Sequence, residues 1–521
     1  MKKGMFLLAT LALSAWALSA GTMASPNGGP LGDFEAHGDV GSPKISGYAT
    51  YNAASQVYTL SAGGVNIWAK RDEFQFAYRR MRGDFIVQAQ AEWVGAGTDP
   101  HRKAGIMARS ALDFDATYVD GALHGEGLVA MQYRKVKGND TEQTMMPDAH
   151  GANVIQLERR GNTFIWSAAK FGEPFQVTQQ ENVDLPEELF VGLFLSAHNV
   201  DVKETAVFRQ VRVIKPVKVG FQPYRDYIGS RLEVMNVANG HRNVYYSSRV
   251  PFEAPNWLPD GSALLFNASG GDPATRGRLW KFDLATRTPT LVDTGFAIRN
   301  NNDHVLSFDG TQLAISDQST DAGQSTIFTL PTRGGVPKRI TPLTPSYMHS
   351  WTPDAKWLIY TGGRIPKGGK DNEFDVYKAA ADGSGKEINL TNSPGLDDGP
   401  EVSPDGQWIY FNSTRTGTMQ IWRMRLDGKN QERVTSDAKF NDWFPHFSQD
   451  GKWITLISYG LDVEPSNHPY YKHCYLRIMP TDGSAAPKVI AYVYGGQGTI
   501  NVPSWSPDGT HIAFVSNSDA L

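Results

Sequence analysis

The chain has 521 residues, of which 40% are hydrophobic and 20% charged, with a formal net charge of −4 at pH 7. This mildly acidic balance, without any block of Lys or Arg, disfavours nucleic acid and anionic membranes as partners. The single cysteine, Cys474, excludes an internal disulfide, so hydrophobic cores must supply the stability, and the length is sufficient for two of them.

Residues 1–24 have the pattern of a cleavable secretory signal. Lys2 and Lys3 precede an apolar stretch at 5–18, and small residues at 22–24 form a cleavage site before Ser25. The apolar stretch is short for a bilayer span, and no later run of 18 apolar residues follows. We therefore expect an exported bacterial protein that is not integral to the membrane, either periplasmic or secreted.

Residues 25–214 carry alternating strand patterns and are expected to form a β-sandwich, followed by a linker at 215–223. The segments 85–92, 103–109 and 156–162 resemble the concanavalin-like jelly-roll modules of bacterial exported proteins, which bind carbohydrate or pack against a neighbouring domain. Three tryptophans are candidate sugar-stacking side chains, with a buried core role as the alternative for at least two of them: Trp68, Trp93 and Trp166.

A Ser-Pro-Asp-Gly motif, exact or degenerate, recurs six times in the remainder of the chain. Its aspartates are Asp260, Asp309, Asp354, Asp405, Asp450 and Asp508, spaced by 49, 45, 51, 45 and 58 residues. A period of about 45 residues with strand-like flanks predicts a β-propeller. Only one strand, at 511–516, follows the last copy, whereas two strands, at 231–237 and 243–248, precede the first. We therefore expect five complete blades and a sixth built from both ends of the segment, which removes free sheet edges.

These turns, together with residues 415–422, 426–428 and 433–435, resemble the TolB-like propellers of the bacterial envelope over residues 224–521. TolB itself pairs its propeller with a small α/β domain, so its transport role is not carried over. Related propellers occur in oligogalacturonate lyases, where His and other polar residues hold a divalent metal. They also gate serine peptidases, but no Gly-x-Ser-x-Gly motif is evident here. The predicted fold is all-β, a jelly-roll sandwich followed by a six-bladed propeller.

The inner strands of a propeller line one channel, so residues just before each turn converge there. Titratable residues of this region include Glu253 and Asp303. The candidate ligand-binding residues are Arg299, Asn302, Tyr347, Asp398, Trp443 and Asn501. The candidate metal ligands are His304, His349, Glu401 and His446, a set that suits Mn²⁺, Zn²⁺ or Fe²⁺. They lie four or five residues before their aspartates, and a shift of one residue turns a strand side chain to the other face. The alternative is that these histidines only bond neighbouring blades.

A long connection at 459–473 interrupts the fifth blade. It contains His468, Tyr470 and Lys472, which are candidate acid/base groups at the channel mouth. The alternative is a loop that docks on the sandwich.

Three functions remain open. The first is a propeller that binds a polar ligand at its channel face, either a glycan or a cell-envelope protein. The second is a metal-dependent carbohydrate lyase or hydrolase, and the third is a scaffold for protein docking alone.

Overall fold

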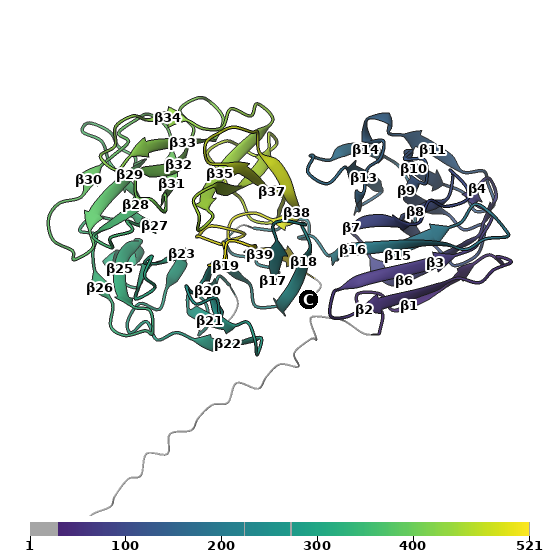
Figure 1. Cartoon of the computed structure of the whole chain (residues 1–521), viewed down its shortest axis with the longest axis horizontal. Coiled ribbons are helices and arrows are strands. Elements are labelled where there is room, and N and C mark those ends of the chain that lie inside the picture. Colours follow the sequence, from purple (N-terminus) through teal and green to yellow (C-terminus); the bar gives the residue numbers. More distant parts are fainter. Residues whose placement is uncertain (1–29, 223, 271–273, 520–521) are drawn as a thin grey trace, which may run out of the picture.

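The structure is a computed structural model that describes residues 30–222, 224–270 and 274–519 (Figure 1). The predicted signal sequence lies outside this part of the chain. The described residues form strands and two short 3₁₀ turns, η1 (Pro147–Ala149) and η2 (Asp321–Gly323). Among them, no helix is long and apolar enough to cross a membrane. The all-β prediction is confirmed.

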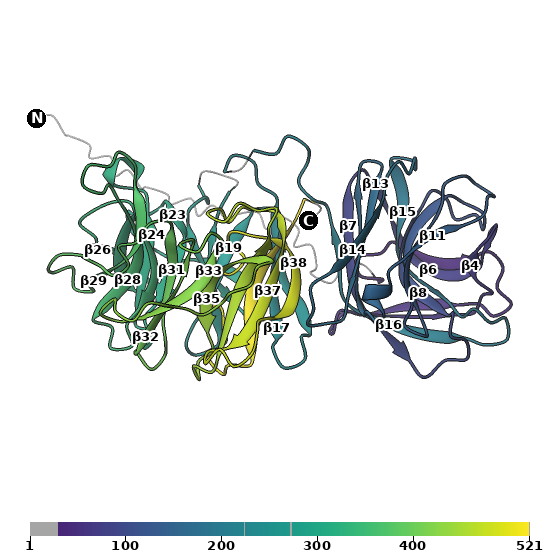
Figure 2. The ribbon, with the colours of Figure 1, turned by 90° about the horizontal axis from the view of Figure 1, so that it is seen from above.

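Two seven-stranded antiparallel sheets form the N-terminal part. The first contains, in spatial order, β1 (Ala36–Val40), β6 (Phe74–Arg82), β15 (Glu188–Ser196), β8 (Lys103–Arg109), β9 (Tyr118–His124), β10 (Val129–Arg134) and β11 (Glu142–Met145). The second contains β14 (Gln176–Gln180), β13 (Thr163–Ala169), β12 (Val154–Arg160), β7 (Phe85–Val94), β16 (Glu204–Ile214), β3 (Val57–Ala62) and β2 (Tyr48–Asn52). A small ribbon joins β4 (Ile67–Trp68) to β5 (Arg71–Asp72). Figure 2 shows the strands of the two sheets as neighbouring layers. Side chains of both sheets, such as Ile106 and Val87, share one buried core.

Six further sheets surround a common centre and form the propeller (Figure 1). Five of these sheets have four strands each, and each sheet is one blade. Blade one contains β19 (Phe252–Trp257), β20 (Ala263–Ala268), β21 (Leu279–Asp283) and β22 (Thr288–Leu291), and blade two contains β23 (Asn300–Leu306), β24 (Gln312–Asp317), β25 (Thr326–Pro331) and β26 (Lys338–Arg339). Blade three contains β27 (Ser346–Trp351), β28 (Trp357–Arg364), β29 (Glu373–Ala380) and β30 (Ile388–Asn389); blade four contains β31 (Asp397–Val402), β32 (Trp408–Ser413), β33 (Gln420–Arg425) and β34 (Glu432–Arg433); and blade five contains β35 (Phe440–Phe447), β36 (Trp453–Gly460), β37 (Lys472–Pro480) and β38 (Lys488–Gly495).

The sixth sheet joins the two ends of the propeller segment. Here β39 (His511–Ser518) pairs with β17 (Gly229–Asn236), which pairs in turn with β18 (Arg242–Ser248). The innermost segment of this blade contributes a single bridge, from Trp505 to Ile512. The predicted closure is confirmed, and the closing strand β17 is hydrogen-bonded on both sides.

The repeated turns explain why the motif has its composition. In each copy the aspartate accepts a hydrogen bond from the backbone two residues later, as Asp508 does from Thr510 at 3.0 Å. Five copies place a glycine next, with φ between 68° and 72°, a region that favours glycine. The third copy has Ala355 there, at φ 55°.

Replacing Ala355 by glycine should stabilise the protein. A left-handed backbone conformation costs a non-glycine residue about 1 kcal/mol. The Ala355→Gly variant recovers part of this free energy, because the greater conformational entropy of glycine in the unfolded chain offsets the rest. The matched variant Gly509→Ala imposes the same strain where no atom crowds the new Cβ. Thermal unfolding should show a higher Tm for the first variant and a lower Tm for the second. Shifts in the same direction would contradict this explanation.

A buried ion cluster joins the propeller to the N-terminal sheets. Glu233 of β17 accepts hydrogen bonds from Arg212 of β16 at 2.6 and 3.2 Å and from Ser516 of β39 at 2.5 Å. Arg242 of β18 lies 3.5 Å from the same carboxylate and donates to Gln88 of β7 at 2.7 Å. Burial alone would raise the pKa of Glu233, but the two arginines and the hydrogen bonds lower it to about 2.

Removing one partner of this cluster should be costly. Arg212→Met leaves the buried Glu233 without its bidentate partner, and such a change typically costs about 3–5 kcal/mol. Arg225→Met is the matched control, because Arg225 pairs with Asp226 where the two side chains are 72% and 40% exposed. When the full chain is unfolded in urea, Arg212→Met should lower the free energy of unfolding several times more than Arg225→Met does. Equal effects would contradict a structural role for the cluster.

Candidate functional site

Six residues, one from each blade, form a ring at the end of the channel where the inner strands begin. Each lies seven residues before its turn aspartate, as Glu253 lies before Asp260. This channel ring consists of Glu253, Asn302, Tyr347, Asp398, Trp443 and Asn501. All except Tyr347 and Asp398, which are partly buried, are buried. Five of these residues are predicted ligand-binding residues, and Glu253 completes the set.

Two buried carboxyl groups lie on the side of the ring formed by blades one and two. Glu253 accepts hydrogen bonds from Asn267 at 3.2 Å and from Asn302 at 3.5 Å. Burial, together with the charge of the nearby Asp303, raises its pKa to about 7. Asp303 accepts a hydrogen bond from Asn301 at 2.8 Å, and burial raises its pKa to about 6. Among the described residues, neither carboxyl has a Lys or Arg partner within 4 Å.

An imidazole and a carboxylate face each other across blades three and four. His349 Nε2 lies 3.4 Å from Asp398 Oδ1, which also accepts a hydrogen bond from the Thr361 hydroxyl at 2.7 Å. Burial lowers the pKa of His349, but Asp398 and Asp303 outweigh it, so the pKa is raised. Burial raises the pKa of Asp398, but the pairing with His349 holds it well below the usual range. The two groups therefore form an ion pair, and the charge of His349 also lowers the pKa of the neighbouring Asp303.

The loop at 461–471 lies over this end of the channel. His468 stacks on Trp443 with ring centroids 4.5 Å apart, and burial lowers its pKa. Tyr470 reaches the other side, where its side chain lowers the pKa of Glu253 and its ring centroid lies 5.6 Å from that of Tyr224. Two of the three predicted acid/base groups therefore lie in the cluster. The third, Lys472, begins β37 and is exposed.

The four predicted metal ligands do not come together, and this part of the prediction is corrected. His349 pairs with Asp398, whereas His446 Nδ1 bonds Glu401 at 2.6 Å and its Nε2 bonds the carbonyl of Ile500. Both nitrogens of His446 thus face protein acceptors. In the described part of the chain, no group of three or more His, Cys, Asp or Glu side chains is placed to share a metal ion.

His304 and Arg299 also differ from their predicted placement. His304 is fully buried against backbone groups of Ala254 and Leu265 in blade one, and burial lowers its pKa to about 4. Arg299 precedes β23, is exposed, and lies beside Gly323. The pairing of His304 with Ile315 is regular up to the turn, and His304 lies five residues before its turn aspartate, whereas Glu401 and His446 lie four before theirs. Alternation along the strand therefore turns His304 to the other face.

Comparisons with known proteins agree with this architecture. The family model of the TolB beta propeller domain, PD40, matches residues 365–464. An uncharacterised protein of Agrobacterium fabrum is 44% identical over 287 residues, which cover 55% of this chain and 92% of the relative. The solved structure of a putative TolB from Agrobacterium tumefaciens is 43% identical, with a TM-score of 0.51, and the match covers 56% of this chain and 99% of that one. The chain belongs to the TolB-type β-propeller family.

The likeness to TolB proteins of the Tol-Pal system is more local. The Tol-Pal system protein TolB of Bordetella pertussis is 42% identical over 53 residues, which are 10% of this chain and 12% of that protein. This TolB-type propeller is preceded by two seven-stranded sheets. The family therefore accounts for the blades, and the site must be argued from its own residues.

Glu253→Gln should remove a pH-dependent destabilisation. The pKa of Glu253 is about 7 in the folded state, whereas the ordinary pKa of a glutamate is 4.5. Between these two pH values the folded state therefore binds more protons than the unfolded state. The unfolding free energy of the wild type should therefore fall by about 2 kcal/mol as the pH rises through it. Thermal unfolding from pH 5 to pH 8 should show the variant gaining Tm relative to the wild type.

The control for this measurement is Glu373→Gln, because Glu373 is exposed. It should follow the wild-type pH profile. If the profile of Glu253→Gln also runs parallel to that of the wild type, the raised pKa of Glu253 is contradicted.

Proposed function

We propose that this chain is an exported TolB-type propeller protein that binds a polar ligand at the channel ring. The ligand is a glycan or a polar segment of a cell-envelope protein. Export, to the periplasm or to the cell exterior, rests on the signal pattern at 1–24. The proposed organisation is a concanavalin-like jelly roll at 25–214, a linker at 215–223 and the propeller at 224–521.

One observation carries the proposal. Glu253 and Asp303 are buried acceptors on one side of the channel ring, and no Lys or Arg of the described residues pairs with them. Buried carboxyl groups are costly unless they are hydrogen-bonded or paired. Hydroxyl or amino groups of a ligand would add donors to the few amide donors that these carboxyl groups already have, while Trp443 and His468 supply an aromatic wall.

A second candidate is acid–base chemistry on a carbohydrate. It is favoured because carboxyl groups of one cluster have widely separated pKa values, that of Asp398 lowered and that of Glu253 raised to about 7. Such separation is how acid and base roles are divided in enzymes. His468 and Tyr470 would act as further proton donors or acceptors in this case.

The full chain should be tested on an array of neutral, amino and acidic glycans and against solubilised envelope extract. We expect a retained ligand that binds about 10-fold more weakly to Asp303→Asn and Asp398→Asn, since each change removes a charged hydrogen-bond acceptor. Lys452→Ala, at an exposed repeat turn, is the control and should bind as the wild type does.

Equal retention by all variants would place binding elsewhere, as a docking scaffold requires. Failure of the wild type to retain any ligand would contradict the proposal. Turnover of a retained glycan by the wild type, abolished in Asp398→Asn, would favour the enzymatic candidate.

A further inference from the structure

An arginine at the junction of the propeller with the N-terminal sheets is buried without a carboxylate partner. Arg231 lies on the closing strand β17 and is only 7% exposed. Its Nη2 donates to the carbonyl of Val213 on β16 at 2.9 Å, whereas Nη1 has no hydrogen-bond partner among the residues that the structure describes. In the same part of the chain, no carboxylate lies within 4 Å of this guanidinium. Charged side chains are seldom buried in this way unless they are paired.

The charged groups around Arg231 do not neutralise it. Burial lowers its pKa most, and the charges of Arg212 and Arg79 lower it further, whereas the more distant Asp33 and Glu233 oppose this change. Glu233 is not free to act as the partner, because both of its oxygens already bond Arg212. Arginine keeps its charge in proteins, so the charge of Arg231 must be balanced by another group.

Arg242 adds to this imbalance from the neighbouring strand β18. Burial and the neighbouring arginines lower its pKa to about 10, against the opposing charge of Glu233. Its Nε and Nη1 also have no hydrogen-bond partner in the described part of the chain, although Nε lies 3.5 Å from Glu233. With both carboxylates ionised, the junction holds an excess of two positive charges, since four arginines share two carboxylates: Arg79, Arg212, Arg231 and Arg242 with Asp33 and Glu233.

A small anion supplies what this junction lacks. A water molecule would accept a hydrogen bond from Nη1 of Arg231, but it would leave the excess charge in place. An anion accepts the same hydrogen bond and removes part of the excess, and such charge-assisted hydrogen bonds are about twice as strong as neutral ones. Arg231 and Arg242 are 7% and 4% exposed, so the junction favours an inorganic anion over a bulky organic acid.

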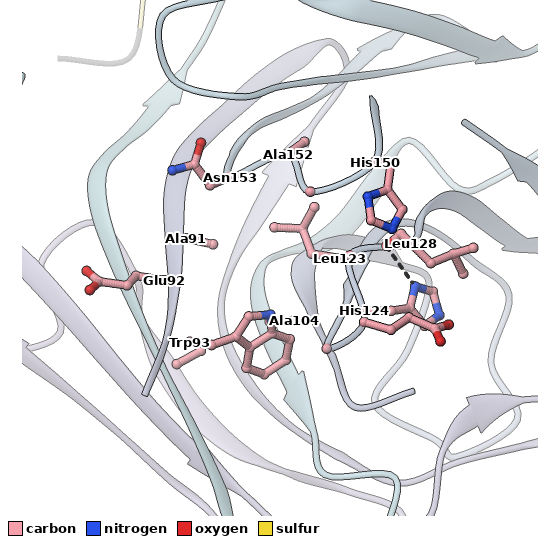
Figure 3. Close-up of a pocket in the computed structure, with 15 residues that line it drawn as sticks. Ala91, Glu92, Trp93, Ala104, Leu123, His124, Leu128, His150, Ala152 and Asn153 are labelled. Carbon is pink, nitrogen blue, oxygen red and sulfur yellow. Dashed lines mark hydrogen bonds between the residues drawn. The ribbon is translucent and has the colours of Figure 1, made fainter. Parts of the chain in front are cut away.

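The pocket between the two N-terminal sheets is not an alternative place for this anion. It has a volume of about 430 Å³ and is bordered by residues of β7, β8, β9 and β16 (Figure 3). Its described lining contains neither Lys nor Arg, but it includes Glu92 and Glu126. The charges therefore direct an anion to the junction and not to this pocket.

We propose that Arg231 binds one small inorganic anion at the junction between β16 and β17. Nη1 of Arg231 donates to the anion, whose charge balances part of the excess of the four arginines. Because β16 belongs to the N-terminal sheets and β17 to the propeller, the bound anion strengthens the docking of these two parts. This site is separate from the channel ring, and its occupancy does not depend on the function proposed for the channel.

The test is thermal unfolding of the full chain in sodium chloride or sodium sulfate, each titrated against sodium gluconate at constant ionic strength. An anion that binds only the folded state raises the Tm as its concentration rises. The Tm of the wild type should therefore rise with chloride, with sulfate or with both, because gluconate is too bulky for the buried junction. Sulfate also stabilises proteins in general, so the quantity that counts is the difference between the wild type and a variant.

Arg231→Met removes the charge and the donor, and it should lose the dependence on the anion that the wild type shows. The control Arg225→Met, at an exposed ion pair, should keep that dependence. A wild-type Tm that follows chloride and sulfate no more than gluconate would overturn the proposal. An unchanged dependence in folded Arg231→Met would do the same.

A crystallographic measurement on the wild type does not rely on the folding of any variant. Bromide replaces chloride and selenate replaces sulfate in crystals of the full chain, at concentrations where the parent anion raises the Tm. We expect an anomalous scattering peak within hydrogen-bonding distance of Nη1 of Arg231. The absence of a peak at this position would contradict the proposed site.

Discussion

A single buried carboxylate holds the architecture together. Glu233 lies on the closing strand β17 and is bonded by Arg212 from the N-terminal sheets and by Ser516 from the last strand. Arg242 extends the cluster back to Gln88. Closure of the propeller and docking of the N-terminal sheets therefore depend on the same charge, and the pairing keeps that charge ionised despite its complete burial.

The channel loop is also held by both parts of the molecule. His468 and Tyr470 cover the channel, while the next residues turn toward the N-terminal sheets. Tyr471 accepts a hydrogen bond from the backbone of Ile228 at 3.2 Å and packs with Ile86 and Ile214. His473 lies 2.9 Å from Glu158 of β12. The loop thus covers the channel and docks on the N-terminal sheets through different residues.

The repeats and their turns could be predicted because their physical requirements are local. A turn aspartate, a left-handed glycine and alternating flanks are visible in a few adjacent residues, and closure follows from the strands left over at each end. The channel ring was also accessible, since its members share one spacing from the turn. The spacing of seven residues also predicts Glu253, whereas residue types alone favour the other five members of the ring.

The four predicted metal ligands do not come together, and local sequence patterns do not show why. Each of the five regular inner strands has a register shift, for example between Asp398 and Glu401 and between Trp443 and His446. His349 lies inside the register shift of its strand, whereas His304 pairs regularly with Ile315, so the same offset of five residues does not place the two rings alike. His304 consequently packs inside a blade, while His446 bonds Glu401. Which end of the channel each side chain faces depends on these bulges.

The central claim is that the end of the channel under the 461–471 loop is the binding face. Photo-crosslinking in the intact envelope tests it most directly, with a photoreactive phenylalanine placed either at Leu461 on this loop or at Val336 near the opposite turns. Both positions are well exposed, 59% and 79% respectively. We expect a specific crosslinked product from position 461, which Asp303→Asn and Asp398→Asn abolish, and none from position 336. Crosslinks from 336 alone, or products from 461 that both substitutions leave intact, would contradict it.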